Sequence, residues 1–401
     1  MRDLEPEELE GIFFVRDKFF ETARIFNFQF MEPTPLEMLA TMEAKSGSAI
    51  SGETYSFTDK GERKVALRFD LTIGLSRFVA GRRDLRLPVK LASFAGVWRY
   101  DEPQAGRYRY FHQWDVEIFG PFSIESDAEV VEFIALFFRN LGLSVRIHIN
   151  DRRLMEEFIR LKLGVKADSD VSEMFRAIDK VSKKGPDAIL EEYGKKVDPS
   201  SLKALIELSN FKGSAEEIEG KAKQVAELPS WKTMVETMSS LRVRRVNNAI
   251  IDLGIVRGLD YYSGTVFEVF LDSGSSSSGG ALVGGGRYDV LTAAFGRKDI
   301  GATGAAGGVE RIVMALQKNN LLPKRRSKLV YVASAVQDGA EQVQRAVSVL
   351  RGAQISADFD MSKRALRKQL EDAAAKGAAF SVILPGKDEA ATFTLRMMSS
   401  G

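Results

Sequence analysis

One short stretch, residues 94–120, carries side chains suited to binding a polar, phosphorylated ligand. It is typical of two strands joined by a turn-rich loop, because Pro103 and Gly106 interrupt it. Side chains alternate between the two faces of a strand. One face of the second strand therefore carries a cation, an aromatic ring, an amide and two carboxylates: Arg109, Phe111, Gln113, Asp115 and Glu117. A face that only covered an apolar core would not carry these groups, so we expect a ligand site here.

Arginines flank this loop on both sides, with Arg99 before it and Arg107 and Arg109 after it. Guanidinium groups bind phosphates through two parallel hydrogen bonds and keep their charge. The sequence contains no G-x-x-x-x-G-K-[ST] phosphate loop, so binding of ATP would need a device of this kind. We therefore expect the arginines to bind phosphates and Phe111 to stack on a base. A solvated arginine face is the alternative.

A second candidate segment, residues 256–264, places Arg257, Asp260 and two tyrosines, Tyr261 and Tyr262, between glycines just before a strand. Such a segment would hold a cation over a reacting centre while the tyrosine hydroxyls contact a polar substrate. An ordinary turn with two packed tyrosines is the alternative interpretation.

A third candidate segment, residues 301–312, leads from small residues into a helix. Arg311 lies near the amino terminus of that helix, where the helix dipole disfavours a cation. A bound phosphate would stabilise Arg311 at this position; a solvent-exposed arginine is the alternative.

Few other residues offer chemistry. The chain has no cysteine, which excludes disulfides and thiolate zinc sites. His112 and His148 both lie in expected strands, and we expect both to be structural and to point away from the polar set. Four basic residues would share one helix face that is either solvated or in contact with RNA: Lys363, Arg364, Arg367 and Lys368.

The composition predicts a globular protein. Of 401 residues, 44% are hydrophobic, which suits two or three domains. No apolar run of about 18 residues occurs, so no membrane span is expected. The amino-terminal segment lacks the apolar part of a secretion signal. A net charge of +2 gives no overall sign of a nucleic-acid partner. We expect a cytoplasmic location.

Periodic patterns predict the elements that position these residues. Helices are expected near residues 7–28, 71–79, 126–141 and 309–318, and another is expected to begin near Pro35. Strands are expected around the central pair at residues 55–59, 65–70, 145–149, 249–252 and 265–270.

The character of the chain changes twice, which predicts three domains. Residues 151–240 are largely helical and rich in Lys and Glu, so we interpret them as a helical domain inserted into the first one. Residues 1–150 and 241–322 would form that first domain. Strands and helices alternate from residue 329 to residue 384, which predicts a small α/β domain over residues 326–401 with a mixed or parallel sheet.

Taken together, these motifs resemble those of class II aminoacyl-tRNA synthetases, specifically the histidyl-tRNA synthetase family. Thr34-Pro35 and the helix after it look like motif 1, the dimerisation element, which implies a homodimer with Pro35 at its interface. Trp98-Arg99-Tyr100-Asp101 with the next strand resembles motif 2, and residues 304–312 resemble motif 3. Residues 256–262 and 284–289 are similar to the two histidine-specific motifs. The resemblance implies an α+β fold, in which helices flank an antiparallel sheet, with the helical insertion and a carboxy-terminal anticodon-binding domain.

The resemblance also implies residue roles toward ATP, which would bind with Mg²⁺. Arg99 and Arg257 would be catalytic: Arg99 would contact the α-phosphate and the substrate carboxylate, and Arg257 would stabilise the transition state. Arg107 and Arg311 would hold the γ-phosphate, and Phe111 would stack on adenine. The metal ligands are not assigned.

For the amino acid, the resemblance implies a histidine site. Asp70, Thr72 and Gln113 would bind the α-amino group. Glu117 and Tyr262 would contact the imidazole, with Tyr261 in the same histidine-binding set. The implied reaction forms histidyl-adenylate and pyrophosphate, then transfers the histidyl group to the 3′ end of tRNA(His), which the insertion and carboxy-terminal domains would contact.

The sequence departs from the family pattern at two places. Asp101 stands where motif 2 usually has Glu, and the carboxy-terminal domain is short, as if truncated. Two alternatives stay open: a synthetase-like regulatory subunit of ATP phosphoribosyltransferase, and an RNA-binding module. Arg257 and residues 329–396 argue against the first alternative, and the polar face of residues 109–117 argues against the second.

Overall fold

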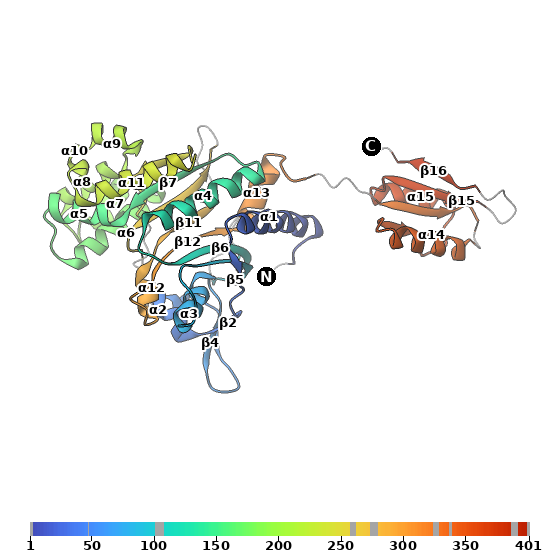
Figure 1. The fold of residues 1–401 in the computed structure, drawn as a ribbon, viewed down its shortest axis with the longest axis horizontal. Helices are drawn as coiled ribbons and strands as arrows, with labels where there is room; N and C mark the ends of the chain where they lie inside the picture. The colour runs from blue at the N-terminus through green and yellow to red at the C-terminus, as the bar shows by residue number, and fades with distance from the viewer. Residues whose placement is uncertain are drawn as a thin grey trace. The chain divides into compact units, whose positions relative to one another are not determined.

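The computed structural model describes residues 3–46, 48–100, 108–256, 262–272, 280–323, 329–336, 339–385 and 392–398. Contacts divide the chain into two compact units, Met1–Leu322 and Pro323–Gly401. The first unit contains a large, mostly antiparallel sheet covered by helices, and the second is a small α/β unit (Figure 1). The predicted α+β class is confirmed.

Among the described residues, the large sheet of the first unit has nine strands. Of the strand pairs that these residues form in this sheet, β1–β5 and β7–β9 are parallel and the others are antiparallel. In spatial order the strands are β1 (Gln29–Phe30), β5 (Val89–Trp98), β6 (Tyr110–Gly120), β12 (Gly301–Gly308), β11 (Val283–Arg287), β10 (Thr265–Leu271), β7 (Val145–Asp151), β9 (Ala249–Asp252) and β8 (Lys212–Gly213). The small-residue stretch of residues 301–308 is therefore a central strand, beside β6.

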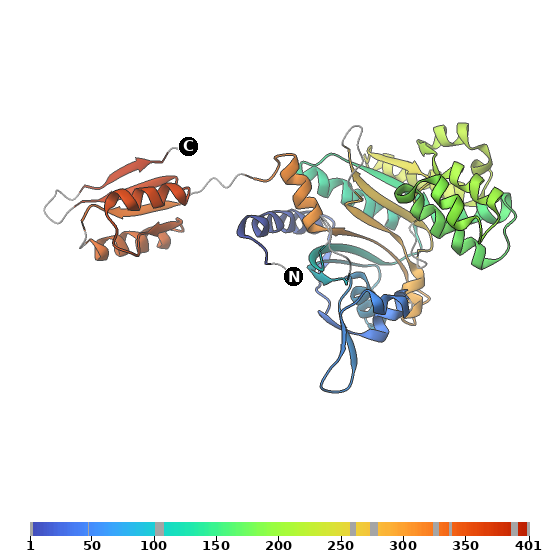
Figure 2. The same ribbon diagram turned by 180° about the vertical axis from the view of Figure 1, so that it is seen from behind.

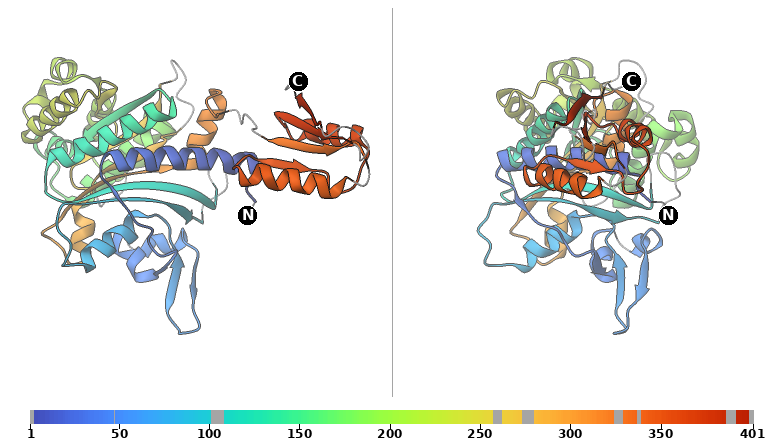
Figure 3. Two further views of the ribbon diagram at one scale, coloured as in Figure 1. Left: turned by 45° about the vertical axis from the view of Figure 1, so that its right-hand side comes forward. Right: turned by 90° about the vertical axis from the view of Figure 1, so that its right-hand side faces the viewer.

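One face of this sheet packs on helices (Figures 1 and 2). They are α1 (Pro6–Ile25), α4 (Ile124–Leu141) and α13 (Val309–Lys318). Trp114 of β6 fills the core between α1 and α4, where its ring lies 5.5 Å from that of Phe19 and 5.2 Å from that of Phe137. The view in the left part of Figure 3 shows α1 and α4 side by side above the sheet.

The opposite face of the sheet packs on a different set of elements. These are α3 (Thr72–Gly81), α12 (Asp289–Ala294) and, beyond them, α2 (Leu39–Ser46), a 3-10 turn (Ser48–Gly52) and a small sheet of β2 (Leu36–Met38), β4 (Lys64–Leu67) and β3 (Ser56–Thr58). The helix expected to begin near Pro35 begins instead at Leu39, because β2 comes first. Pairing of β2 with β4 supplies the backbone hydrogen bonds of this segment.

Between β7 and β9 the chain is helical, apart from the short β8. The elements are α5 (Arg152–Glu157), a π-helix (Phe158–Lys162), α6 (Asp168–Lys184), α7 (Pro186–Tyr193), α8 (Pro199–Ser209), α9 (Ala215–Lys221), α10 (Lys223–Ala226) and α11 (Pro229–Val243). Their apolar faces, for example Phe175 and Leu205, join the same core as α1 and α4.

The second unit has strand order β14-β13-β15-β16. Its elements are β13 (Val330–Ser334), α14 (Ala340–Gly352), β14 (Ala357–Phe359), α15 (Leu366–Ala375), β15 (Phe380–Leu384) and β16 (Thr394–Met397). The first three strands are parallel and β16 is antiparallel, so the sheet is mixed. The sequence pattern did not predict β16.

Candidate active site

The polar face expected on β6 lies on the side of the sheet away from α1 and α4. Gln113, Asp115 and Glu117 are all buried there, and Gln113, the most accessible of them, is 3% exposed. Opposite them on β12 stand only small residues, Gly308, Ala306 and Gly304 in that order. The neighbouring strand therefore leaves space into which the side chains of β6 can lean.

A chain of hydrogen bonds joins four of the expected polar side chains. Arg99 Nη2 donates to Gln113 Oε1 at 3.0 Å, and Gln113 Nε2 donates to Asp115 Oδ1 at 2.8 Å. Thr72 Oγ1 donates to Asp115 Oδ2 at 2.9 Å. The structure thus brings together Arg99 and two residues expected at the α-amino group, and Asp115 is the link.

Arg99 is fixed by more than this chain. Its Nε donates to the carbonyl of Phe69 at 3.2 Å, and its guanidinium lies 4.5 Å from the Phe69 ring centre and 5.0 Å from that of Phe111. Cation–π contacts of this kind hold a guanidinium plane in one orientation. Next to this group, Asp70 Oδ1 accepts from the backbone N–H of Ile73 at 3.0 Å and so caps the first turn of α3.

Glu117 accepts a short hydrogen bond from the hydroxyl of Tyr288. Both side chains are buried. Burial and the adjacent Glu117 carboxylate raise the pKa of Tyr288 well above its ordinary value, so the phenol stays protonated and donates. Tyr288 was not among the residues assigned from the sequence, although the segment that contains it was.

Two glycines make room around this pair. A β-carbon on Gly304 would stand 1.4 Å from Glu117 Oε2, so only glycine fits beneath the carboxylate. Gly286, opposite Gly304 on β11, has φ +149°, and a β-carbon there would stand 3.1 Å from the ring of Tyr262. Tyr262 is 6% exposed. Glu117 therefore lies beside Gly304 of β12, and Tyr262 lies beside Gly286 of β11, which pairs with Gly304.

Tyr288 is held by a buried ion-pair group at the end of β11. Arg287 donates to Asp127 of α4 at 2.8 and 3.2 Å and to Asp289 Oδ1 at 3.2 Å. Burial raises the pKa of Asp127, while the Arg287 charge opposes that shift. Asp289 also accepts from the backbone N–H of Ala302 on β12 at 2.8 Å. The segment that carries Tyr288 is thus anchored to α4 and β12 on both sides.

At the start of α13, Glu310 turns inward to β6. Its carboxylate accepts from the backbone N–H of His112 at 2.8 Å and lies 3.0 Å from His112 Nδ1. Arg311, the next residue, donates through Nη1 to the carbonyl of Ala281 at 3.0 Å. His112 therefore connects the strand of Phe111 to the helix of Arg311, the structural role expected of it.

The orientation expected for His148 is wrong. Residues that pair across neighbouring strands point to the same face of a sheet. A row of such pairs connects His148 to Asp115 through Glu268, Gly284 and Ala306, so His148 lies on the polar face. The buried carboxylate of Asp252 lies 2.7 Å from its Nδ1 and 2.8 Å from Lys212 Nζ. The strand at residues 145–149 was predicted correctly, as β7. The face on which its side chains lie relative to those of β6 depends on the strand order, which sequence alone does not give.

Three expected site residues, Arg107, Arg257 and Tyr261, lie outside the described residues, as does Asp101. Pro35 is exposed, and its carbonyl accepts from the N–H of Arg68 at 3.0 Å. Within the part of the chain that the structure describes, no group of three or more His, Cys, Asp or Glu residues could hold a metal ion. None of the described helices is long and apolar enough to span a membrane.

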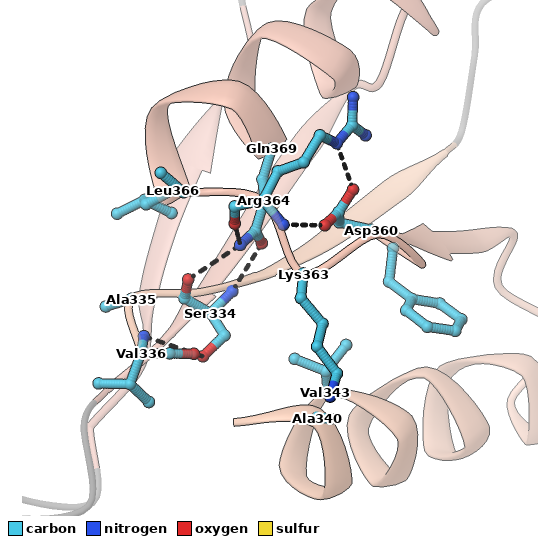
Figure 4. A pocket seen from close by; sticks show the side chains of 12 residues that line it. Ser334, Ala335, Val336, Ala340, Val343, Asp360, Lys363, Arg364, Leu366 and Gln369 are labelled. Atoms are coloured by element: carbon cyan, nitrogen blue, oxygen red, sulfur yellow. Dashed lines mark hydrogen bonds and ion pairs between the residues drawn. The ribbon is translucent and has the colours of Figure 1, made fainter. Parts of the chain in front are cut away.

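The second unit contains a pocket of about 70 Å³ at the carboxyl ends of β13 and β14 (Figure 4). Gln369 crosses its base, accepting from the N–H of Ser334 at 3.0 Å and donating to the carbonyl of Arg364 at 2.7 Å. Lys363 and Arg364 line it, and Asp360 binds the backbone N–H of Arg364 at 2.6 Å.

The basic helix face expected in this unit is wrong. Helix α15 begins only at Leu366, so Lys363 and Arg364 precede it. Arg364 pairs with Asp360, while Arg367 and Lys368 pair with Glu371. The carboxylate of Asp360, which accepts the backbone N–H of Arg364, holds this segment out of the helix.

Comparisons with known proteins identify the family of this chain. The family model described as histidyl-tRNA synthetase matches residues 1–312. The histidine–tRNA ligase of Thermococcus kodakarensis is 34% identical over 413 aligned residues, which cover 100% of this chain and 93% of that protein. The histidine–tRNA ligase of Pyrococcus abyssi is also 34% identical, with 100% of this chain and 94% of that protein covered.

Solved structures share the fold. The histidyl-tRNA synthetase of Nostoc superposes with a TM-score of 0.79 at 22% identity, covering 99% of this chain and 95% of that one. A protein of Bacillus halodurans described as an ATP phosphoribosyltransferase regulatory subunit/histidyl-tRNA synthetase gives a TM-score of 0.76 at 21% identity, covering 96% and 97%. The match of the family model over most of the chain and the identity to full-length relatives show that this chain belongs to the histidyl-tRNA synthetase family.

Proposed function

We infer that this chain is a histidine–tRNA ligase, an enzyme that activates histidine with ATP and transfers it to tRNA(His). The observation that carries this conclusion is the 34% identity over the whole chain to relatives named histidine–tRNA ligase. The buried Glu117–Tyr288 pair agrees with it, because it offers a polar site for a ring with two nitrogens.

In the first step, the carboxylate of histidine would attack the α-phosphorus of ATP and release pyrophosphate. Negative charge grows on phosphate oxygens, so fixed cations are the main means of stabilising the transition state. We assign this role to Arg99, whose guanidinium is already held by Gln113 and two rings, and to Arg257. Arg107 and Arg311 would bind the γ-phosphate, and Phe111 would stack on adenine.

Selection of histidine would rest on Glu117 and Tyr262, with Tyr261 nearby in sequence. Any apolar amino acid would leave a buried carboxylate without the partner that an imidazole N–H supplies, which is a strong basis for rejection. We assign the α-amino group to Asp70, Thr72 and Gln113.

We propose that Mg²⁺ accompanies ATP. This ion is usually held by one or two carboxylates together with substrate phosphates and waters rather than by a cage of protein ligands.

For the tRNA, we propose contacts by the helical insertion, residues 151–240, and by the carboxy-terminal domain, residues 326–401, with residues 1–150 and 241–322 forming the catalytic domain. In open α/β sheets, ligands bind beyond the carboxyl ends of the parallel strands. The pocket at that edge of the second unit, lined by Lys363 and Arg364, supports a contact with RNA there.

We also propose a homodimer and a cytoplasmic location. The segment around Pro35 exposes apolar side chains that a second copy would cover: Leu36 is 39%, Met38 45% and Phe57 50% exposed. Contiguous exposed apolar groups of this kind mark interaction surfaces.

The test is histidine-dependent exchange of pyrophosphate into ATP by the purified protein with Mg²⁺, followed by charging of tRNA(His). Exchange with histidine and not with other amino acids is expected. Histidine binding without exchange would favour the other candidate function, a regulatory subunit of ATP phosphoribosyltransferase, which the description of the Bacillus halodurans structure raises.

A further inference from the structure

Asp115 is the most deeply buried carboxylate of the polar face, with 0% exposure, and nothing in the proposed reaction uses it directly. It lies between two side chains assigned to the α-amino group of histidine. One of its oxygens accepts from Thr72 Oγ1 at 2.9 Å, and the other accepts from Gln113 Nε2 at 2.8 Å.

These two bonds decide which atoms Thr72 and Gln113 can offer to a ligand. A threonine hydroxyl has one hydrogen and two lone pairs, and its hydrogen is directed at Asp115. Thr72 can therefore only accept from a further partner. A glutamine amide can present either its oxygen or its nitrogen. The Gln113 nitrogen faces Asp115, whose Oδ1 accepts from it at 2.8 Å.

The other neighbour of Gln113 gives the same orientation. Arg99 can only donate, and its Nη2 lies 3.0 Å from Gln113 Oε1. The amide is thus held from both ends, with its oxygen on the side of Arg99. A primary ammonium group carries three donors and no acceptor, so a site that recognises it needs acceptors alone.

We propose that Asp115 is a positioning residue that leaves acceptor atoms of Thr72 and Gln113 for the amino group, by taking the Thr72 hydroxyl hydrogen and one Gln113 amide hydrogen. This inference rests on the proposed function, since it assigns the ligand group as the α-ammonium of histidine. It adds a specificity element: Asp115 favours an amino acid over the corresponding acid without the amino group.

The substitution D115N tests the hydrogen-bond logic with almost no change of volume. Asparagine presents one oxygen and one NH₂, so it cannot accept from both neighbours. Either the Thr72 hydroxyl must accept and turn its hydrogen toward the ligand, or the Gln113 amide must turn over. Each change places a donor where the ammonium needs an acceptor.

The measurement is the dissociation constant, by titration calorimetry, of histidine and of 3-(imidazol-4-yl)propionate, which is histidine without its α-amino group. In D115N, histidine is expected to bind about 10–100-fold more weakly, the usual effect of losing hydrogen bonds to a charged group, while the analogue changes by less than about threefold. T72V should also reduce the preference for histidine over the analogue, and T72S should restore most of that preference. Equal weakening of both ligands in D115N, or no weakening, would overturn the proposal.

Ser93 supplies the matched control. It is buried on β5 opposite Asp115, yet its hydroxyl is outside this chain of bonds, so S93A should leave the preference unchanged. If D115N does not fold, as judged by circular dichroism, the comparison of T72V with T72S decides instead, and an unchanged preference in T72V overturns the proposal. A wild-type protein that binds no histidine would reject the proposed function, and this inference with it.

Discussion

The carboxylate of Glu117 occupies the space that a side chain at Gly304 would need. Its Oε2 atom lies 1.4 Å from the position of a β-carbon on Gly304, and the two residues face each other across β6 and β12. A contact this close cannot be relieved by a small shift of the strand, because Gly304 is also paired with Gly286 of β11.

The substitution G304A should therefore displace Glu117 and disturb the imidazole site while leaving the arginines in place. We expect the kcat/KM for histidine in pyrophosphate exchange to fall by about 10²-fold or more, with a change of less than about threefold in the KM for ATP. Gly81, at the end of α3, serves as the control: a β-carbon added there would have no atom within 4 Å, so G81A should be fully active. A normal KM for histidine in G304A would show that Glu117 does not contact the substrate.

Replacing Tyr288 by Phe removes the hydroxyl that donates to Glu117 and keeps the ring. The buried carboxylate then loses a hydrogen bond to a charged group, which corresponds to about 1.5–3 kcal/mol. We expect the KM for histidine to rise by about 10-fold or more, with ATP binding intact. Steady-state kinetics with each substrate varied in turn will measure this; equal changes in both KM values would indicate general unfolding of the site.

The sequence allowed the polar face of β6 to be predicted because strand alternation is local. Gln113 and Glu117 follow from counting residues, and Asp115 was placed on that face although no role was assigned to it. The contacts of Tyr288 and Gly304 could not be predicted in this way. Both depend on the order β6-β12-β11, which places segments about 170 residues apart in the chain side by side.

Two errors have the same origin. The side of His148 depends on the same long-range strand order, and Pro35 leads into β2 because β4 lies beside it. Local patterns favoured a helix near Pro35, but backbone pairing with a strand formed later in the sequence decided the outcome. The sequence did contain one signal for Tyr288: this residue lies within residues 284–289, the segment that is similar to a histidine-specific motif.

Asp252 of β9 contacts His148 and Lys212, and its titration should change the free energy of unfolding with pH. Burial raises its pKa, but the hydrogen bond from His148 and the Lys212 charge outweigh burial, so the pKa lies below the ordinary value of 3.8. Its contribution to stability is therefore complete above the unfolded-state pKa and is lost as the pH falls through the folded-state pKa.

We expect D252N to lower the free energy of unfolding at pH 7 by about 1–3 kcal/mol, as for other buried hydrogen-bonded groups that lose a partner. The variant should also lose less stability than the wild type between pH 5 and pH 3, as measured by urea unfolding. D84N, which breaks the exposed pair of Asp84 with Arg82, is the control and should change little. Parallel pH profiles for D252N and the wild type would contradict this account.

The division between the two compact units at residues 322 and 323 permits a clean truncation. A protein that ends at Leu322 keeps all the residues assigned to ATP and histidine. We expect pyrophosphate exchange within about threefold of the full chain, and charging of tRNA(His) reduced by about 10-fold or more, since contacts with the RNA phosphates would be lost. Unchanged charging would show that residues 323–401 are not needed to recognise the tRNA.

The central claim is that Glu117 selects histidine, and the substitution E117A tests it most directly. The measurement is pyrophosphate exchange with histidine and ATP each varied in turn. We predict that kcat/KM for histidine falls by about 10³-fold or more, because a buried contact to the imidazole is lost, while the KM for ATP changes by less than about threefold. If kcat/KM fell equally for histidine and for ATP, the claim would be contradicted.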